Sequence, residues 1–325
     1  MQSRRGSRLP PASSTIALAL AVDTVTAEVI TALRDAGVRP LLLKGPSIAG
    51  WLYRDGVARP YGDSDLLVSP GSYRRAGAVL RELGFRSLGY LSQQHRDSDA
   101  WTRSDHAYVD LHRSLVGADA SPDTVWDEVS ANTQLLRVGG IDVEVLAIPG
   151  RVLHVALHAA QHGVDDEQPL QDLRRAVLTV DDAVWREAAE MARRVDALPA
   201  FATGLRLEPV GTLLAEQLEL PATRQSLVGL RAGPHVPVAV TLERLATETS
   251  LRARARLLFA ALFPPPDYMR KWAAGRMGPS SGTGRRARFS LGLAYLWRPI
   301  WILLRLPRAM TTVHRVRRGR TKTAT

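Results

Sequence analysis

The sequence feature that most constrains the fold is a pair of aspartates, Asp63 and Asp65, at the start of the apolar run 66–68. Residues two apart in a β-strand point to the same face of a sheet, so a strand over 63–68 would place both carboxylates side by side. Because like charges repel at that distance and burying either alone is costly, the pair predicts a site for a hard divalent cation such as Mg²⁺. A solvated turn capped by the aspartates is the alternative.

A second constraint lies just upstream, where an apolar run over 38–43 ends in Lys44-Gly45-Pro46-Ser47. The run predicts a buried strand, and proline suits the first position of a following helix. Exposed N–H groups at a helix start attract anions, and Lys44 adds a full positive charge. We therefore expect a phosphate-binding cradle. The alternatives are a surface lysine that ends a strand and, for Ser47, an ordinary helix-start residue.

Size and composition narrow the class of protein. The 325 residues can form two modest domains, and the absence of cysteine excludes disulfides and cysteine-based zinc or thiol chemistry. The net charge of +11 is uneven: residues 251–325 hold 17 Lys and Arg against one acid, whereas the other 250 residues hold 26 bases and 31 acids. The basic tail therefore suits anionic lipid, RNA or an acidic partner, and no specific nucleic-acid binding is expected of the body.

The N-terminal region resembles a signal peptide at first sight, because three arginines precede the apolar stretch 16–22. Asp23 interrupts that stretch, and apolar residues continue beyond it at helical spacing. We therefore favour an amphipathic first helix that ends near Gly37.

The pattern up to residue 148 predicts an α/β (α+β) fold, with a small mixed sheet covered by helices on one face. In the predicted strand 106–112, alternation places Asp110 on one face with His106, Tyr108 and His112. Helices are expected to start at Pro46 and Pro70. The other expected strands are 40–44, 63–68 and 85–91, with a hairpin over 135–146 around Gly139-Gly140.

The second half of the chain is predicted to be mostly helical, with segments at 150–163, 167–179 and 183–195 and others to about 262. We divide the chain into a sheet-containing domain at 1–148, a helical domain at 149–277 and a linker with a basic apolar tail at 278–325. The helical domain is expected to lie on the side of the substrate that accepts the transferred group, and is called the acceptor-side domain. Arginines interrupt the apolar stretch 289–306 in that tail, which disfavours a spanning helix. A helix on anionic lipid or on a partner is favoured over a segment packed back on the body.

Histidines form a second group of candidate residues. His154, His158 and His162 recur every four residues and share one helix face, but the glutamate of a His-Glu-x-x-His zinc motif is absent. We therefore favour packing between domains or the lining of an acceptor pocket. His112 is expected either to hydrogen-bond near Asp110 or to fill the sheet face.

Residues 41–112 resemble the polymerase-β-like nucleotidyltransferase superfamily, and are most similar to a bacterial family of uncharacterised nucleotidyltransferases. In that superfamily a third acid lies on a neighbouring strand, and Asp110 matches it. Similarity continues through His158, His162 and Asp172, and weakly to Met269. The matching motifs are Leu43-Lys44-Gly45, Leu52-Tyr53, Arg59 and Asp63-Ser64-Asp65-Leu66-Leu67-Val68. One departure is Pro46, which separates Gly45 from Ser47.

The resemblance implies transfer of a nucleoside monophosphate from an NTP such as ATP to a hydroxyl-type acceptor, either a small molecule or a peptide, with release of pyrophosphate. Asp63, Asp65 and Asp110 would be catalytic and hold two Mg²⁺ ions. The triphosphate would be bound by Lys44, Gly45, Ser47 and Arg59, with a structural ion pair as the alternative for Arg59.

Two alternative hypotheses assume the same fold but no nucleotidyl transfer. One is a non-catalytic nucleotide-binding protein, and the other is a membrane-associated scaffold protein that acts through the basic tail. In each case we expect a cytoplasmic location, with the tail able to reach the inner face of the membrane.

Overall fold

The computed structural model describes residues 12–88, 98–222, 237–247, 250–264, 266, 269 and 285–318. Contacts divide the chain into two units, Met1–Leu157 with Gln171–Leu198, and His158–Leu170 with Pro199–Thr325. The predicted domain boundary near residue 148 differs from this grouping, because Asp172 and the helices that follow it belong with the sheet. The domain limits drawn from the sequence stay a prediction.

The first unit is built on a seven-stranded mixed sheet with the order β3-β4-β5-β2-β1-β7-β6. At its centre, β2 runs parallel to β5 and antiparallel to β1, and β1 runs parallel to β7. This confirms the predicted α+β class with a mixed sheet. The strands are β1 (Pro40–Leu42), β2 (Ser64–Val68), β3 (Arg86–Ser87), β4 (Ser98–Thr102), β5 (Tyr108–His112), β6 (Thr133–Val138) and β7 (Ile141–Leu146).

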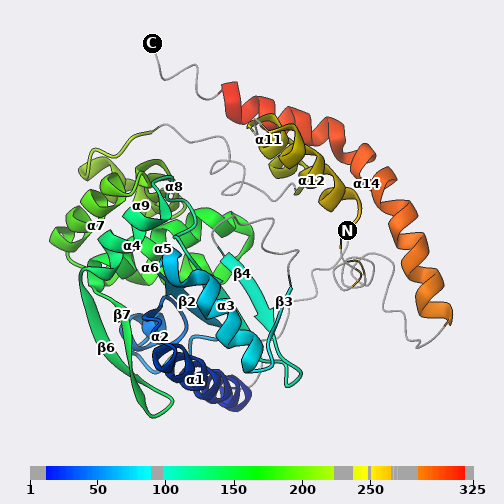
Figure 1. Ribbon diagram of the computed structural model, residues 1–325. Coiled ribbons are helices and arrows are strands. Elements are labelled where there is room, and N and C mark those ends of the chain that lie inside the picture. The colour runs from blue at the N-terminus through cyan, green and yellow to red at the C-terminus, as the bar shows by residue number, and fades with distance from the viewer. Residues whose placement is uncertain are drawn as a thin grey trace. The chain divides into compact units, whose positions relative to one another are not determined.

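One face of this sheet is covered by α1 (Ala12–Asp35) and α3 (Tyr73–Glu82), which lie side by side in Figure 1. Ile30 and Leu33 of α1 are completely buried in a core that includes Leu66 and Leu111. Burying each such side chain contributes about 1.5–3 kcal/mol. Ser64 also faces α1, because its hydroxyl hydrogen-bonds that of Thr26. Alternation along β2 therefore directs Asp65 to the opposite face.

The remaining helices belong to both units, and α5 begins in the first and ends in the second. In the second unit α14 packs on α11 and α12. The helices are α2 (Pro46–Leu52), α4 (Pro122–Ser130), α5 (Ile148–His162), α6 (Glu167–Thr179), α7 (Asp182–Arg194), α8 (Leu198–Leu205), α9 (Pro209–Gln217), α11 (Pro237–Thr247), α12 (Leu251–Leu262) and α14 (Arg285–Arg318), with 3₁₀ turns η1 (Pro70–Ser72) and η2 (Gly163–Asp165).

Several predicted elements differ from the observed ones. β3 covers only Arg86–Ser87 of the strand expected at 85–91, of which residues 89–91 lie outside the described part. β5 begins at Tyr108, and His106 sits in the preceding turn at φ +66°, so it does not share the strand face with Asp110. β4 and α4 were not predicted. β4 opens with Ser98-Asp99, which disfavour strands, and pairing with β5 overrides that preference.

The tail forms a single helix. α14 continues through Pro299 and Pro307, and Arg298 and Arg305, which interrupt its apolar stretch, lie within it. The predicted linker at 278–284 lies outside the described residues. Among the described helices, only Thr15–Asp35 is long and apolar enough to cross a membrane. That segment supplies Ile30 and Leu33 to the core, as the interpretation as an amphipathic first helix predicts.

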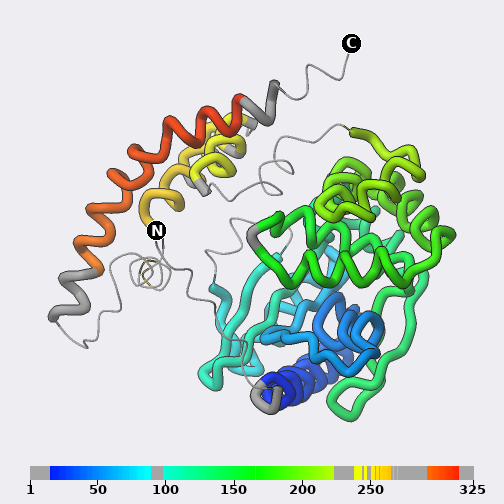
Figure 2. The backbone as a smooth tube through the Cα atoms, turned by 180° about the vertical axis from the view of Figure 1, so that it is seen from behind, coloured from blue at the N-terminus to red at the C-terminus, as the bar shows by residue number. Residues whose placement is uncertain are grey.

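The hairpin of β6 and β7 forms at the predicted glycines and holds α1 against the sheet. Gly139 and Gly140 both have positive φ, +55° and +86°, as a two-residue hairpin turn requires. Figure 2 shows the tip of this hairpin near α1. A Cβ on Gly139 would lie 2.4 Å from the Asp23 carbonyl oxygen, whereas one on Gly140 would meet nothing within 4 Å.

This difference makes the two glycines a matched pair for a test of stability. We expect Gly139→Ala to lower the free energy of unfolding by about 3 kcal/mol, because backbone strain and a clash with α1 add together. Gly140→Ala should cost only about 1 kcal/mol, from strain alone. Urea unfolding of both variants measures this, and equal losses would contradict the role of Gly139 in packing α1.

Candidate active site

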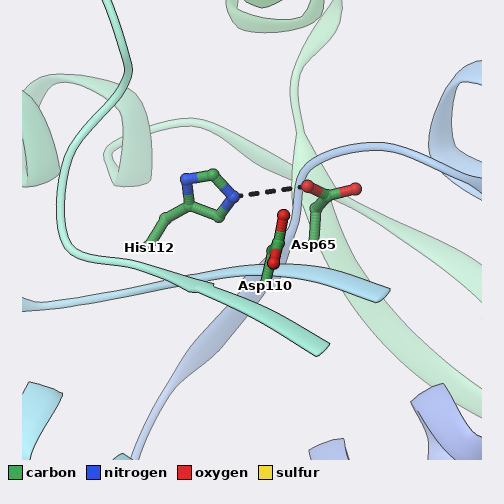
Figure 3. Close-up of side chains that lie close together, drawn as sticks. All are labelled: Asp65, Asp110 and His112. Carbon is green, nitrogen blue, oxygen red and sulfur yellow. Dashed lines mark hydrogen bonds and ion pairs between the residues drawn. The ribbon is translucent and has the colours of Figure 1, made fainter. Parts of the chain in front are cut away.

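The centre of the site is formed by Asp65 and Asp110, which occupy equivalent positions on adjacent parallel strands. Leu66 and Leu111 belong to the core under α1 and α3, so the two aspartates project from the opposite face. Ligand atoms of Asp65, Asp110 and His112 all lie within 4.8 Å of one another. Figure 3 shows the two carboxylates close together, with His112 beside them.

The other predicted carboxylate, Asp63, lies one residue before β2 and is half-buried. Its pKa is raised to about 6, chiefly because Asp65 repels its charge and secondly because of burial. Asp63 therefore lies close enough to Asp65 to share its electrostatic environment, as predicted from the spacing of the two residues.

Lys44 forms an ion pair with one of these acids. Its Nζ lies 2.7 Å from Oδ1 of Asp65. Burial alone would lower the pKa of Lys44, but Asp65 and then Asp63 outweigh that effect and raise it, so the ammonium stays charged. The backbone fixes this position, since the Leu43 amide donates to the Asp65 carbonyl at 2.9 Å.

The turn after Lys44 has a backbone that only glycine adopts readily. Gly45 has φ +60° and ψ −120°, so a side chain there would strain the backbone, although its Cβ would meet the Tyr61 ring only at an ordinary contact distance of 3.4 Å. Ser47 follows at the start of α2. Its hydroxyl is buried and has no hydrogen-bond partner among the described residues. A buried hydroxyl without a partner is costly, so Ser47 is a polar group available to a ligand.

The charges of the site do not balance within the protein. Burial raises the pKa of Asp65, but Lys44 and His112 outweigh it and hold that pKa well below its usual range. Burial, followed by repulsion from Asp65, raises the pKa of Asp110. Three carboxylates thus share one ammonium at close range, and the surplus negative charge favours binding of a further cation.

The donor set fits a hard divalent ion. Carboxylate oxygens of Asp65 and Asp110 are the ligands that Mg²⁺ prefers, and Asp63 supplies a third carboxylate nearby. The Nε2 atom of His112 lies 3.3 Å from Oδ1 of Asp65, an arrangement that orients the carboxylate. The sequence left open whether His112 hydrogen-bonds near Asp110 or fills the sheet face; it lies near Asp110, and its hydrogen bond is to Asp65 on the neighbouring strand.

Arg59 is held in a buried ion pair. Its Nε and Nη2 donate to both oxygens of Asp172 at 2.6–3.1 Å, and the Tyr53 hydroxyl donates to the same carboxylate at 2.6 Å. Arg59 and Asp172 are 6% and 2% exposed. This is the structural alternative that the sequence left open, and the phosphate-binding role of Arg59 stays a prediction. The cluster fixes the segment between Tyr53 and Asp63 against α6, a function that sequence reasoning did not assign to Asp172.

The three histidines of the 150–163 region have different environments. His154 is buried, and burial followed by the nearby charge of Lys44 lowers its pKa to about 3, so the ring is neutral at pH 7. The rings of His158 and His162 are 4.4 Å apart, and Nδ1 of His162 lies 2.9 Å from Asp166. Among the described residues, the group with three metal-ligating side chains is the one around Asp65, and it contains none of these histidines.

A mixed sheet that presents neighbouring aspartates beside a glycine turn defines a protein of the nucleotidyltransferase class. A family model described as uncharacterised nucleotidyltransferase matches residues 13–209, and the chain belongs to this family. The weaker resemblance near Met269 lies beyond the matched region. None of the curated proteins matches the chain.

Two solved structures are similar to parts of the chain. One is the solution structure of the antibiotic-resistance factor ANT(2'')-Ia, which is 16% identical with a TM-score of 0.40 and covers 54% of this chain and 94% of that chain. The other is the crystal structure of an antigenic nucleotidyltransferase-like protein from Paracoccidioides brasiliensis, which is 13% identical with a TM-score of 0.33. This match covers 59% of the present chain and 94% of that protein.

The raised pKa of Asp63 predicts a pH-dependent effect on stability. Folding raises this pKa from 3.8 to about 6, so Asp63 destabilises the fold increasingly from about pH 4 to pH 6. In EDTA, Asp63→Asn should leave the free energy of unfolding unchanged below pH 4. Above pH 6.5 it should raise that energy by on the order of 2 kcal/mol. Urea unfolding against pH measures this, with exposed Glu82→Gln as the control. A destabilised variant at pH 7 would contradict the repulsion.

The buried ion pair predicts a large cost for removing one partner. Asp172→Asn should lower the free energy of unfolding by about 3 kcal/mol, because it leaves the Arg59 charge buried and uncompensated. The double variant Arg59→Met/Asp172→Asn should recover part of that loss. Asp55→Asn removes an exposed, solvent-screened pair with Arg175 and should cost far less than Asp172→Asn. Equal costs for Asp172→Asn and Asp55→Asn in urea unfolding would show that the pair is not structural.

Proposed function

We propose that this protein transfers a nucleoside monophosphate from an NTP to a hydroxyl group of a small molecule or peptide and releases pyrophosphate. One observation carries the proposal: Asp65 and Asp110 lie in register on parallel strands, within reach of the Lys44 turn. Family membership supports the reaction class, and the geometry supports where it occurs. A cytoplasmic location is proposed with it, since NTPs and Mg²⁺ are supplied there.

The proposed metal site consists of Asp63, Asp65 and Asp110, which would hold two Mg²⁺ ions, with Asp110 contributing to one of them. When bound, these ions would neutralise charge on the triphosphate and polarise its phosphorus–oxygen bonds. His112 keeps the Asp65 carboxylate oriented for this task through its Nε2 contact.

The proposed phosphate site consists of Lys44, Gly45 and Ser47. Gly45 lets the backbone turn sharply, the Ser47 hydroxyl offers a buried hydrogen bond, and Lys44 offers positive charge to the pyrophosphate as it leaves. Arg59 would contribute to the potential at the triphosphate without leaving Asp172, because its charge also reaches Asp63 and Asp65.

In the proposed reaction the acceptor oxygen forms a bond to the α-phosphorus, and the bond from that phosphorus to the pyrophosphate oxygen breaks. The acceptor proton passes to Asp110, which is half-buried and lies on the strand beside Asp65. A general base of this kind contributes roughly 10²–10⁴-fold to a rate. Holding the carboxylate by strand register, and not by a loop, fixes its position before substrate binds.

The experiment uses the full chain with each of the four NTPs labelled at the α-phosphorus, Mg²⁺ and a metabolite extract. A labelled, nucleotidylated product and an equal amount of pyrophosphate are expected, and both should disappear in EDTA. We expect Asp110→Asn to lower the rate by at least 10²-fold. Glu82→Gln, which removes an exposed acid on α3, should leave the rate unchanged.

Two outcomes would overturn the proposal. Tight, Mg²⁺-dependent NTP binding with no labelled product from any extract would identify a non-catalytic nucleotide-binding protein. Product formation that survives both Asp65→Asn and Asp110→Asn would place the reaction at another site.

A further inference from the structure

The long helix α14 exposes an apolar face that no other described element of its unit covers. Its side chains recur at helical spacing over about five turns and are 43–72% exposed. Soluble proteins rarely leave so many large apolar side chains contiguous unless something binds them. This outer stripe of α14 consists of Leu293, Leu296, Trp297, Ile300, Leu303, Leu304 and Met310.

The opposite face of α14 is already occupied. Ala294, Trp301 and Ala309 are buried in a small core with Val238 and Ala239 of α11. Figure 1 shows α11 and α12 lying along one side of α14. The helix is therefore apolar on two faces, and its packing within the unit accounts for only one of them.

Two polar contacts hold α14 against α12 and argue against a membrane-spanning state. Nε of Arg298 donates to the Ala261 carbonyl at 2.7 Å, and the Tyr295 hydroxyl donates to the Pro264 carbonyl. Arg298 is only 7% exposed. Spanning a bilayer would remove this arginine from its carbonyl partner and place it in hydrocarbon, at considerable cost.

The positive charge of α14 indicates what kind of partner binds the outer stripe. The helix contains nine arginines and no acidic residue over Arg285–Arg318. Among them, Arg305 and Arg308 are exposed, and Arg305 also stacks 4.2 Å from the Trp301 ring. A protein partner would need a matching apolar groove with a strongly acidic rim. An anionic bilayer supplies both the apolar layer and the negative charge over its whole surface.

We infer that α14 binds the surface of an anionic membrane, with the outer stripe lying among the acyl chains and its exposed arginines, Arg305 and Arg308, at the headgroups. The helix lies in the plane of the interface and keeps its contacts with α11 and α12. This surface goes beyond the proposed nucleotidyl transfer and does not depend on it. Its consequence is that the family's chemistry would take place beside a lipid surface.

Vesicle flotation of the full chain tests the inference, with phosphatidylcholine vesicles that do or do not contain phosphatidylserine. We expect binding only to the anionic vesicles, and at least a tenfold loss between 0.1 and 1 M salt, because screening weakens the arginine contribution. Leu296→Gln/Leu303→Gln should lower binding at least tenfold. The matched control is Leu135→Gln/Leu178→Gln, which changes two equally exposed leucines outside α14 and should bind like the parent chain.

Three results would overturn the inference. The first is equal flotation of the stripe variant and the control variant, or no flotation of the parent chain. The second is a dimer in light scattering that the stripe variant converts to a monomer, which would assign the stripe to a second copy. The third is a lower melting temperature of the stripe variant than of the control variant without vesicles, which would show that another part of the same chain covers the stripe.

Discussion

Repulsion among carboxylates is the constraint that the first unit has to accommodate at its candidate site. The charge of Asp65 raises the pKa of both Asp63 and Asp110, and Lys44 relieves only part of this repulsion. A protein that needed only stability would replace such a cluster with apolar side chains of similar size. The proposed function would account for the stability given up here, because a site for cations and phosphates needs such charges.

The sheet holds these carboxylates in place because one of its faces packs on the apolar core and the other carries the charged residues. Leu66 and Leu111 anchor β2 and β5 to the core under α1 and α3, and their neighbours Asp65 and Asp110 must then face the other way. A shift of register by one residue would bury both carboxylates in the apolar core. The hydrophobic core thus fixes the geometry of the acidic pair as firmly as any direct contact at the site.

The sequence predicted the parts of this arrangement that depend on local pattern. Alternation identified Asp65 and Asp110 as residues of strands, and the Gly139-Gly140 turn identified the hairpin; Asp63, expected in the same strand as Asp65, lies one residue before β2. Local pattern did not predict that β2 and β5 are adjacent, because strand order depends on contacts between distant segments; only the family resemblance placed Asp110 on a neighbouring strand, and it did not give the parallel direction. The pairing of His112 with Asp65, and not with its neighbour Asp110, follows from that order.

Other differences also have non-local causes. Nothing in the spacing of Tyr53, Arg59 and Asp172 shows that a carboxylate more than a hundred residues away neutralises Arg59. β4 opens with two polar residues, and its pairing with β5 along its whole length overrides their preference. α14 passes through two prolines, which sequence rules treat as helix ends, and its packing on α11 outweighs the lost hydrogen bonds.

Lys44 connects the two halves of the proposed site. Its ammonium lies on the same Asp65 oxygen that accepts the contact from His112, so a metal ion at that carboxylate would have to share it or displace the ammonium. A lysine has a flexible stem and three donors, and a triphosphate beside the Gly45 turn would give it a new anionic partner. Nucleotide binding would then release Asp65 for the metal, and the metal would favour the nucleotide in return. This reciprocity follows from the position of a single cation between carboxylates and a phosphate cradle, and it explains why a lysine at the end of β1 is more useful here than a neutral residue.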